Sequence, residues 1–562
     1  MAGTRSVDLT AMSDYGVASV LTPRMWVALG LLGLAMMVAL LQRRPPSWVL
    51  AVNVVALCFC VFGLSSLLSD VPRSAITFRH VGVTNALISA GMVDRSVDAY
   101  FDWPGFFVGV ATVTKAAGLS SPLALARWAP LAVNLMCLPP LLILFRALTS
   151  DRRKVWLAAW FCCALNWINQ DYLSPQSFDF ILYLSVLALL VTLFRPTVTG
   201  HPDRGRPAAA LLVLLLCAAV VPAHQLTPFA LLTVVSALVL CRQCTLLFLP
   251  FILLTAIVAW DGYVALPYIS GHAQALFGSV GDVKSAANAN IASRVAGSPD
   301  HLTIVHIRLA LTLVVWFLAG LVSLWQLGRR RFDLTMLVLA WSPLLLIPTQ
   351  PYGGEMLLRV FWFSLPGVSL LLATAALPAP RPDRQTIGVL RPVDVPRSAR
   401  VLTSARWSLL TVLTVGLLIS SFVARYGNER MDHFSQAEMD GTNALYRLVP
   451  PNALIIAGSG SFPWRSQGYV EHKVTEVNRM WTPGDLPATT LTLLRRMRAE
   501  PDGAVLVITR SQMEAADMLG LLPTGSLHQL TARLDDSPSF REVYRNADVD
   551  IWQACGSKGA PC

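Results

Sequence analysis

The chain has 562 residues, of which 54% are hydrophobic and only 14% are charged. Long uncharged runs recur along most of its length, which excludes an ordinary soluble protein and predicts a polytopic α-helical membrane protein. The net charge of +11 comes largely from arginines in short loops between apolar runs, a pattern that indicates membrane topology and argues against a nucleic-acid partner.

The apolar runs predict about twelve transmembrane helices. They form a membrane domain over residues 1–424, with a large first outer loop at 70–127 and a linker rich in Arg and Pro at 378–406. The predicted spans are 25–41, 48–68, 128–148, 155–168, 178–194, 208–221, 228–240, 246–260, 307–327, 334–348, 360–377 and 407–424.

Arginine clusters occur in alternate connections, for example at 152–154, 329–331 and in the linker 378–406. The positive-inside rule predicts that these connections are cytoplasmic, so the loop 70–127 and the other polar connections face outward. The last span then places the tail 425–562 outside as well. We therefore expect a multi-pass protein of the cytoplasmic membrane with an extracytoplasmic C-terminal domain.

The tail differs in pattern from the membrane domain. Short apolar runs at 453–457 and 504–509 favour buried strands, and 435–448 and 491–498 have helical spacing. These patterns predict a small α/β domain. Its turn Gly458-Ser459-Gly460-Ser461 favours a plain turn over a phosphate-binding loop.

Within the first outer loop, three aspartates are candidate catalytic bases: Asp70, Asp98 and Asp102. A carboxylate at the membrane surface can accept a proton from a sugar hydroxyl, and the neighbouring rings of Tyr100 and Trp103 can stack on a sugar. The alternative is a capped loop helix whose aspartates face water, and this interpretation is favoured for Asp94.

Two later connections share a pattern, Q-D-Y-L-S-P-Q at 170–176 and H-Q-L-T-P at 224–228. In each, a hydroxyl residue precedes a proline, which predicts a helix N-cap with Pro at the first helical position. The spans before them have about 14 residues, or roughly 21 Å against a hydrocarbon core of ~30 Å. Polar groups at that depth suit a cavity that binds an anion such as phosphate, although capped helix ends in headgroup water are the alternative. The candidate binding residues are Gln170, Asp171, Tyr172, Ser174, Gln176, His224 and Gln225.

A third motif, Y-G-G-E-M-L-L-R at 352–359, places Glu355 and Arg359 on one helix face. They form either a simple intrahelical ion pair or a phosphate site in which Glu355 orients the guanidinium of Arg359.

Taken in order, H-V-G-V from His80, D-A-Y-F-D-W-P-G-F-F from Asp98, and the three later motifs resemble a group of large bacterial membrane proteins, common in actinobacteria, assigned to the GT-C glycosyltransferases. The resemblance covers the membrane region and, more weakly, the tail. It implies a GT-C-like fold, a polyprenyl-phosphate sugar donor and inverting transfer on the outer face. It also implies an essential acidic residue in the first outer loop, a role that falls to Asp70 or to Asp98 and Asp102. His80 joins the candidate binding residues.

Other functions remain open at this stage. A transporter or flippase of a lipid-linked saccharide, a surface-glycan polymerase or ligase, and a non-catalytic scaffold are the alternatives. The acceptor, which is a glycan, a lipid or a protein, is not determined, nor is a divalent-metal requirement. Most cysteines lie in spans without a CxxC pair, which argues against a thiolate metal site. Only Cys555 and Cys562 lie in a polar segment, and the sequence does not determine whether they form a disulfide.

Overall fold

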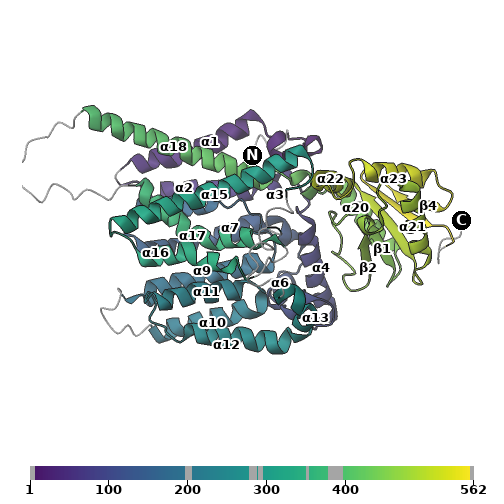
Figure 1. Ribbon diagram of the computed structural model, residues 1–562, viewed down its shortest axis with the longest axis horizontal. Coiled ribbons are helices and arrows are strands. Elements are labelled where there is room, and N and C mark those ends of the chain that lie inside the picture. The colour runs from purple at the N-terminus through teal and green to yellow at the C-terminus, as the bar shows by residue number, and fades with distance from the viewer. Residues whose placement is uncertain are drawn as a thin grey trace, which may run out of the picture.

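The computed structural model describes residues 7–42, 44–196, 206–277, 288, 295–349, 354–377 and 397–556. It consists of a helical bundle, which ends with helix α18 (Arg397–Tyr426), and a C-terminal α/β domain attached at one end of the bundle (Figure 1). Most of the predicted linker 378–406, the first two residues of the Y-G-G-E motif and Cys562 lie outside the described residues.

Seven helices of the described chain are long and apolar enough to cross a membrane. A bent pair, α12 (Leu249–Ala259) continued by η5 (Trp260–Val264) and then α13 (Leu266–Phe277), turns by 88° and adds an eighth if it is one span. The seven are α1 (Pro23–Leu41), α7 (Leu123–Leu148), α9 (Pro175–Leu193), α10 (Arg206–Ala223), α15 (Pro299–Gly328), α17 (Met356–Ala376) and the part of α18 from Ser404 to Tyr426.

The remaining predicted spans contain shorter helices, so every predicted apolar run includes a helix, while the number of twelve spans stays a prediction. These helices are α2 (Ser47–Phe62), α8 (Arg152–Ala164), α11 (Thr227–Leu240) and α16 (Leu334–Trp341), which continues into η7 (Ser342–Leu346).

Helices α17 and α8 form the centre of the bundle. In α17, 89% of the apolar window is buried, against 28–61% for the other six long helices, and every residue of α8 from Val155 to Ala164 is buried. The stack of Phe180 on Trp362, with ring centroids 4.2 Å apart, joins α9 to α17.

The first loop is largely helical. It follows α3 (Leu64–Leu68) and contains α4 (Ala75–Ala90), α5 (Ala99–Asp102) and α6 (Gly105–Ala116). Figure 1 shows α4 running across the end of the bundle that faces the C-terminal domain, and we call this the α4 end. At the opposite end, Arg195 pairs with Asp333 at 2.7 Å, so predicted cytoplasmic connections meet each other there.

The C-terminal domain contains one five-stranded sheet in the order β2-β1-β3-β5-β4. Strand β1 (Leu454–Ala457) pairs in parallel with β2 (Lys473–Glu476) and with β3 (Ala504–Thr509), where Leu454 lies opposite Ala504. Strand β5 (Val549–Ala554) pairs antiparallel with β3 and with β4 (Phe540–Arg545). The predicted strands are β1 and β3, two of the three interior strands, and their sequences are continuous apolar runs because both faces are covered.

Helices cover the sheet and link it to the bundle: α19 (Glu429–Asp432), α20 (Gln436–Leu448), η10 (Val477–Met480), α21 (Leu486–Arg498), α22 (Arg510–Leu519) and α23 (Ser526–Asp535). The predicted helices 435–448 and 491–498 correspond to α20 and the second half of α21. Cys555 is disulfide-bonded, whereas the eight cysteines of the bundle have free thiols.

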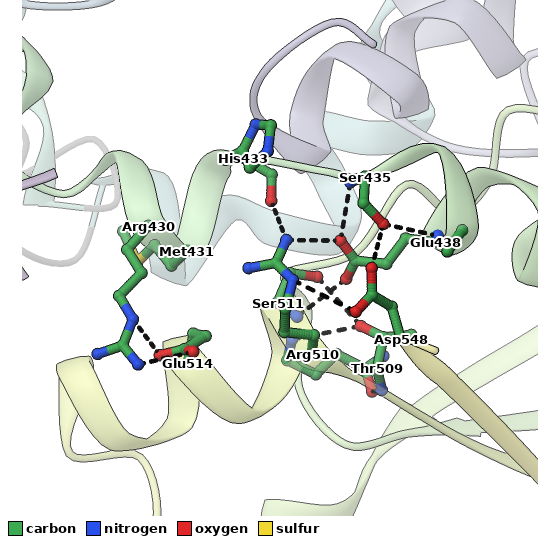
Figure 2. A network of polar contacts seen from close by, with 12 residues as sticks. Arg430, Met431, His433, Ser435, Glu438, Thr509, Arg510, Ser511, Glu514 and Asp548 are labelled. Atoms are coloured by element: carbon green, nitrogen blue, oxygen red, sulfur yellow. Dashed lines mark hydrogen bonds and ion pairs between the residues drawn. The ribbon is translucent and has the colours of Figure 1, made fainter. Parts of the chain in front are cut away.

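Ion pairs fix the joint between the two parts (Figure 2). Arg430 of α19 pairs with Glu514 of α22 at 2.6 Å and with Asp14 near the N-terminus at 2.9 Å. Arg510 pairs with the buried Glu438 of α20 at 2.9 Å. The contacts of Arg430 link α22 to the N-terminal segment of the bundle, while the pair of Arg510 and Glu438 joins α22 to α20 within the domain.

Candidate active site

His80 lies at the centre of a buried aromatic cluster beneath α4. Its ring stacks on Tyr172 with centroids 5.6 Å apart and contacts the edges of Tyr100 and Phe107 at 5.1 and 5.5 Å. Burial lowers the pKa of His80 to about 4, so the imidazole is neutral at pH 7. Its Nδ1 donates to the carbonyl of Leu173 at 2.9 Å, which leaves Nε2 as a hydrogen-bond acceptor.

Arg359, in the first turn of α17, lies beside this cluster. It pairs with Glu355 at 2.6 Å, and its side chain is only 10% exposed. Beyond the effect of burial, the positive charge of Arg359 lowers the pKa of both His80 and His224. Burial raises the pKa of Tyr100 overall, although the same charge lowers it. The charge of Arg359 therefore acts on His80, His224 and Tyr100, which come from three other segments of the chain, and we call these four residues the Arg359 cluster.

The N-termini of α9 and α11 open at the same end of the bundle. Ser174 caps α9 as predicted, and its Oγ accepts from the backbone N–H of Ser177 at 3.1 Å. At α11 the structure differs from the prediction, because Thr227 lies inside the first turn. The ring of His224 takes the capping role, and its Nδ1 accepts from the N–H of Thr227 at 3.2 Å. A neutral His224 then carries its proton on Nε2.

The first turns of α9 also contain buried polar side chains. Within the described part of the chain, neither amide atom of Gln176 has a hydrogen-bond partner, nor does Oε1 of Gln170. Gln176 lies one turn from Phe180, and Arg359 lies one turn from Trp362, so the Phe180–Trp362 stack places both polar residues above one contact between α9 and α17. Gln225, in contrast, is only half-buried.

Asp179 was not among the predicted site residues, although an acidic residue inside an apolar run is itself a signal of function. The residue is fully buried, and neither carboxylate oxygen has a hydrogen-bond partner among the described residues.

Asp171 lies in a different environment. Its Oδ1 pairs with Arg425 at 2.9 Å, with side chains only 2% and 1% exposed, and its Oδ2 accepts from Asn134 at 2.5 Å. Both carboxylate oxygens are therefore occupied in a contact that ties the connection before α9 to the end of α18.

The three candidate bases occupy three different environments. The Asp70 side chain is 88% exposed and pairs with Arg127 at 2.8 Å. Asp98 caps α5, and its Oδ2 accepts from the hydroxyl of Tyr469 and faces Arg79 at 3.4 Å. Asp102 is buried, and burial raises its pKa to about 6.

Other parts of the chain hold the first loop in place. Trp260 of η5 donates from Nε1 to the carbonyl of Asp102 at 3.1 Å. The ring of Trp103 packs edge-on against Tyr268 of α13 at 5.8 Å. Asp94 is exposed, and its carboxylate accepts hydrogen bonds from the N–H and the hydroxyl of Ser96, in agreement with a solvated loop position.

A residue of the C-terminal domain, Tyr469, contacts the first loop. The hydroxyl of Tyr469 donates to Asp98 and accepts from Nε of Arg79 at 3.0 Å. The two backbones approach so closely that a Cβ on Gly82 of α4 would lie 1.6 Å from the carbonyl oxygen of Arg465. Sequence reasoning missed Tyr469 because no local pattern links it to the loop. In the described chain, no group of three His, Cys, Asp or Glu side chains forms a metal site.

No family model and no curated protein matches the chain. Several solved structures are similar to it in fold. The oligosaccharyltransferase AglB of Archaeoglobus fulgidus, in complex with an inhibitory peptide and a dolichol-phosphate, is similar with a TM-score of 0.52 and 10% identity over 91% of this chain and 74% of that chain. ArnT from Cupriavidus metallidurans, bound to undecaprenyl phosphate, is similar with a TM-score of 0.50 and 14% identity over 90% and 97%. The predicted polytopic helical membrane fold with a small C-terminal α/β domain is thus confirmed, and the chain shares this fold with AglB and ArnT.

Proposed function

We propose that this protein is an inverting glycosyltransferase that moves a sugar from a polyprenyl-phosphate donor to a glycan, lipid or protein acceptor on the outer face of the cytoplasmic membrane. The observation that carries the proposal is the Arg359 cluster, a guanidinium beside two neutral imidazoles and a phenol at the α4 end. The undecaprenyl phosphate bound to ArnT, which shares the fold, supports a lipid phosphate as the ligand.

In this proposal the lipid phosphate lies against Arg359. The guanidinium and the N-termini of α9 and α11 stabilise the negative charge that develops as the phosphate leaves. The Nε2–H of His224 is a further donor. Because both imidazoles are neutral at pH 7, the positive charge for the phosphate comes from arginine.

We assign the base to Asp70. A base must contact the acceptor hydroxyl, and of the three loop aspartates Asp70 alone has a largely exposed carboxylate, while Asp98 is held by three donors. Arg127, which pairs with Asp70, lines a small cavity together with Arg73 and Tyr172, and Tyr172 also stacks on His80.

The reaction then needs one carboxylate. Asp70 takes the proton of the acceptor hydroxyl, and the hydroxyl oxygen attacks the anomeric carbon. The bond between that carbon and the lipid phosphate breaks, and its electron pair stays on the phosphate oxygen. A phosphate leaves without a second acid, unlike the alkoxide leaving groups of glycosidases.

The disulfide at Cys555 supports an oxidising, extracytoplasmic location for the C-terminal domain.

The test uses purified full-length protein with labelled polyprenyl-phosphate sugars. Asp70→Asn should lower turnover by roughly 100-fold or more with donor binding retained, whereas Arg359→Gln should weaken donor binding. Arg329→Gln, at the opposite end of α15, is the matched control for loss of an arginine. Unchanged turnover in Asp70→Asn with loss in Asp98→Asn or Asp102→Asn would reassign the base. Lipid movement without sugar transfer would replace the transferase by a flippase.

A further inference from the structure

A second polar cavity lies outside the Arg359 cluster. It has a volume of 360 Å³ and is formed where α15, the start of α17 and the C-terminal domain meet. Its polar lining residues include His301, Arg308 and Asn428. Leu357 of α17 also lines it, and because consecutive helical residues are rotated by roughly 100°, Arg359 points away from Leu357. The cavity is thus separated from the proposed donor site by α17.

The depth of Arg308 in the membrane follows from helix length. From Leu309 to Gly328, α15 has about 20 residues, which span roughly 30 Å, the thickness of the hydrocarbon core. Arginines 329–331 follow directly at the other end. Arg308 therefore lies at the level of the lipid headgroups on the α4 side. Its Nε donates to the carbonyl of Ala424 at 2.8 Å, which fixes the position of the guanidinium.

An apolar stripe leads away from the cavity along the surface of α15. Leu309 lines the cavity, and Leu313 and Phe317 follow at intervals of four residues with exposed fractions of 63% and 64%. This spacing places the three side chains on one face of the helix. An alkyl chain can follow this face, whereas a free anion would make no use of it.

The C-terminal domain closes the other side of the cavity. Leu519 and Leu521, at the end of α22, line it. This end is tied to the start of α15 by the N–H of Ser298, which donates to the carbonyl of Met518 at 2.9 Å. A headgroup in the cavity would contact both parts of the protein.

We propose that this cavity binds a phospholipid with an anionic headgroup. The phosphate pairs with the guanidinium of Arg308, the amide of Asn428 and the ring of His301 supply polar contacts, and an acyl chain lies along Leu309, Leu313 and Phe317. The site does not depend on the proposed transferase activity, because the lipid is bound and not consumed.

The experiment measures lipid binding by the full-length protein, delipidated in a neutral detergent and titrated with phosphatidylglycerol or phosphatidylcholine. Both lipids carry the phosphate, but the trimethylammonium group of phosphatidylcholine adds a positive charge close to Arg308, whereas phosphatidylglycerol keeps a net negative headgroup. We therefore expect phosphatidylglycerol to bind about tenfold or more tightly, the factor typical of a charged contact. Arg308→Gln should remove the preference. Leu521→Trp, which fills the cavity from the C-terminal domain without changing any charge, should reduce binding of both lipids. Arg329→Gln is the matched control and should bind as the wild type does.

Equal affinity for the two lipids would overturn the proposal, as would unchanged binding in both Arg308→Gln and Leu521→Trp. Displacement of phosphatidylglycerol by inorganic phosphate at equal concentration would show an anion site without a lipid role. If Arg308→Gln fails to fold because Arg308 also supports the end of α18, the result for Leu521→Trp decides.

Discussion

The buried pair of Asp171 and Arg425 allows a quantitative test of whether a predicted ligand residue is structural. The two side chains are 2% and 1% exposed, and Nη2 of Arg425 lies 2.9 Å from Oδ1 of Asp171. The guanidinium also packs over the ring of Phe62, 4.7 Å from its centroid. Asp171→Asn keeps the size of the side chain but leaves the arginine charge buried without its counterion. Removing one partner of such a pair costs about 3–5 kcal/mol.

Thermal unfolding of the protein in nanodiscs should therefore show a large loss of stability in Asp171→Asn. Asp535→Asn is the control, because it removes one carboxylate from the exposed contacts of Arg545, where an ion pair contributes about 0–1 kcal/mol. The double variant Asp171→Leu with Arg425→Met should recover most of the loss, since neither charge is then buried alone. Wild-type stability in Asp171→Asn combined with lost donor binding would refute the structural role and make Asp171 a ligand residue.

Three further outcomes are expected. Tyr469→Phe should lower the free energy of unfolding by about 1.5–3 kcal/mol, because the charged hydrogen bond that joins the C-terminal domain to Asp98 of the first loop is lost; unchanged thermal stability would contradict this role. Gly82→Leu should undock the C-terminal domain, because a side chain there meets the backbone of Arg465, and limited proteolysis should detect the new exposure; a protease-resistant variant would refute the contact. Burial raises the pKa of Glu429 to about 7 from 4.5, so its ionisation destabilises the folded state increasingly between pH 4.5 and 7. Relative to Glu429→Gln, the wild type should therefore lose thermal stability as pH rises through this window, and parallel pH profiles would contradict the shift.

Local patterns predicted the positions of most helices and of the central strands. In lipid, where no water can bind the backbone, an apolar run forms a helix because its N–H and C=O groups must bond to each other. This constraint acts on each segment by itself. The strands β2, β4 and β5 were not predicted, because none of them is a continuous apolar run and each includes exposed or half-buried residues. Ser174 was identified as a helix cap for the same local reason, since capping involves only neighbouring residues.

By itself, the sequence determined the membrane class, the α/β tail and the segments that contribute polar groups to the α4 end. Only the tertiary structure decided which of these groups share a site. Asp171 and Gln176 come from one motif, yet the first is neutralised by Arg425, 254 residues away, while the second is buried without a partner among the described residues. Tyr469 reaches Asp98 across 371 residues. Burial and ion pairing between such distant segments depend on how helices and domains pack, and no local spacing encodes that packing.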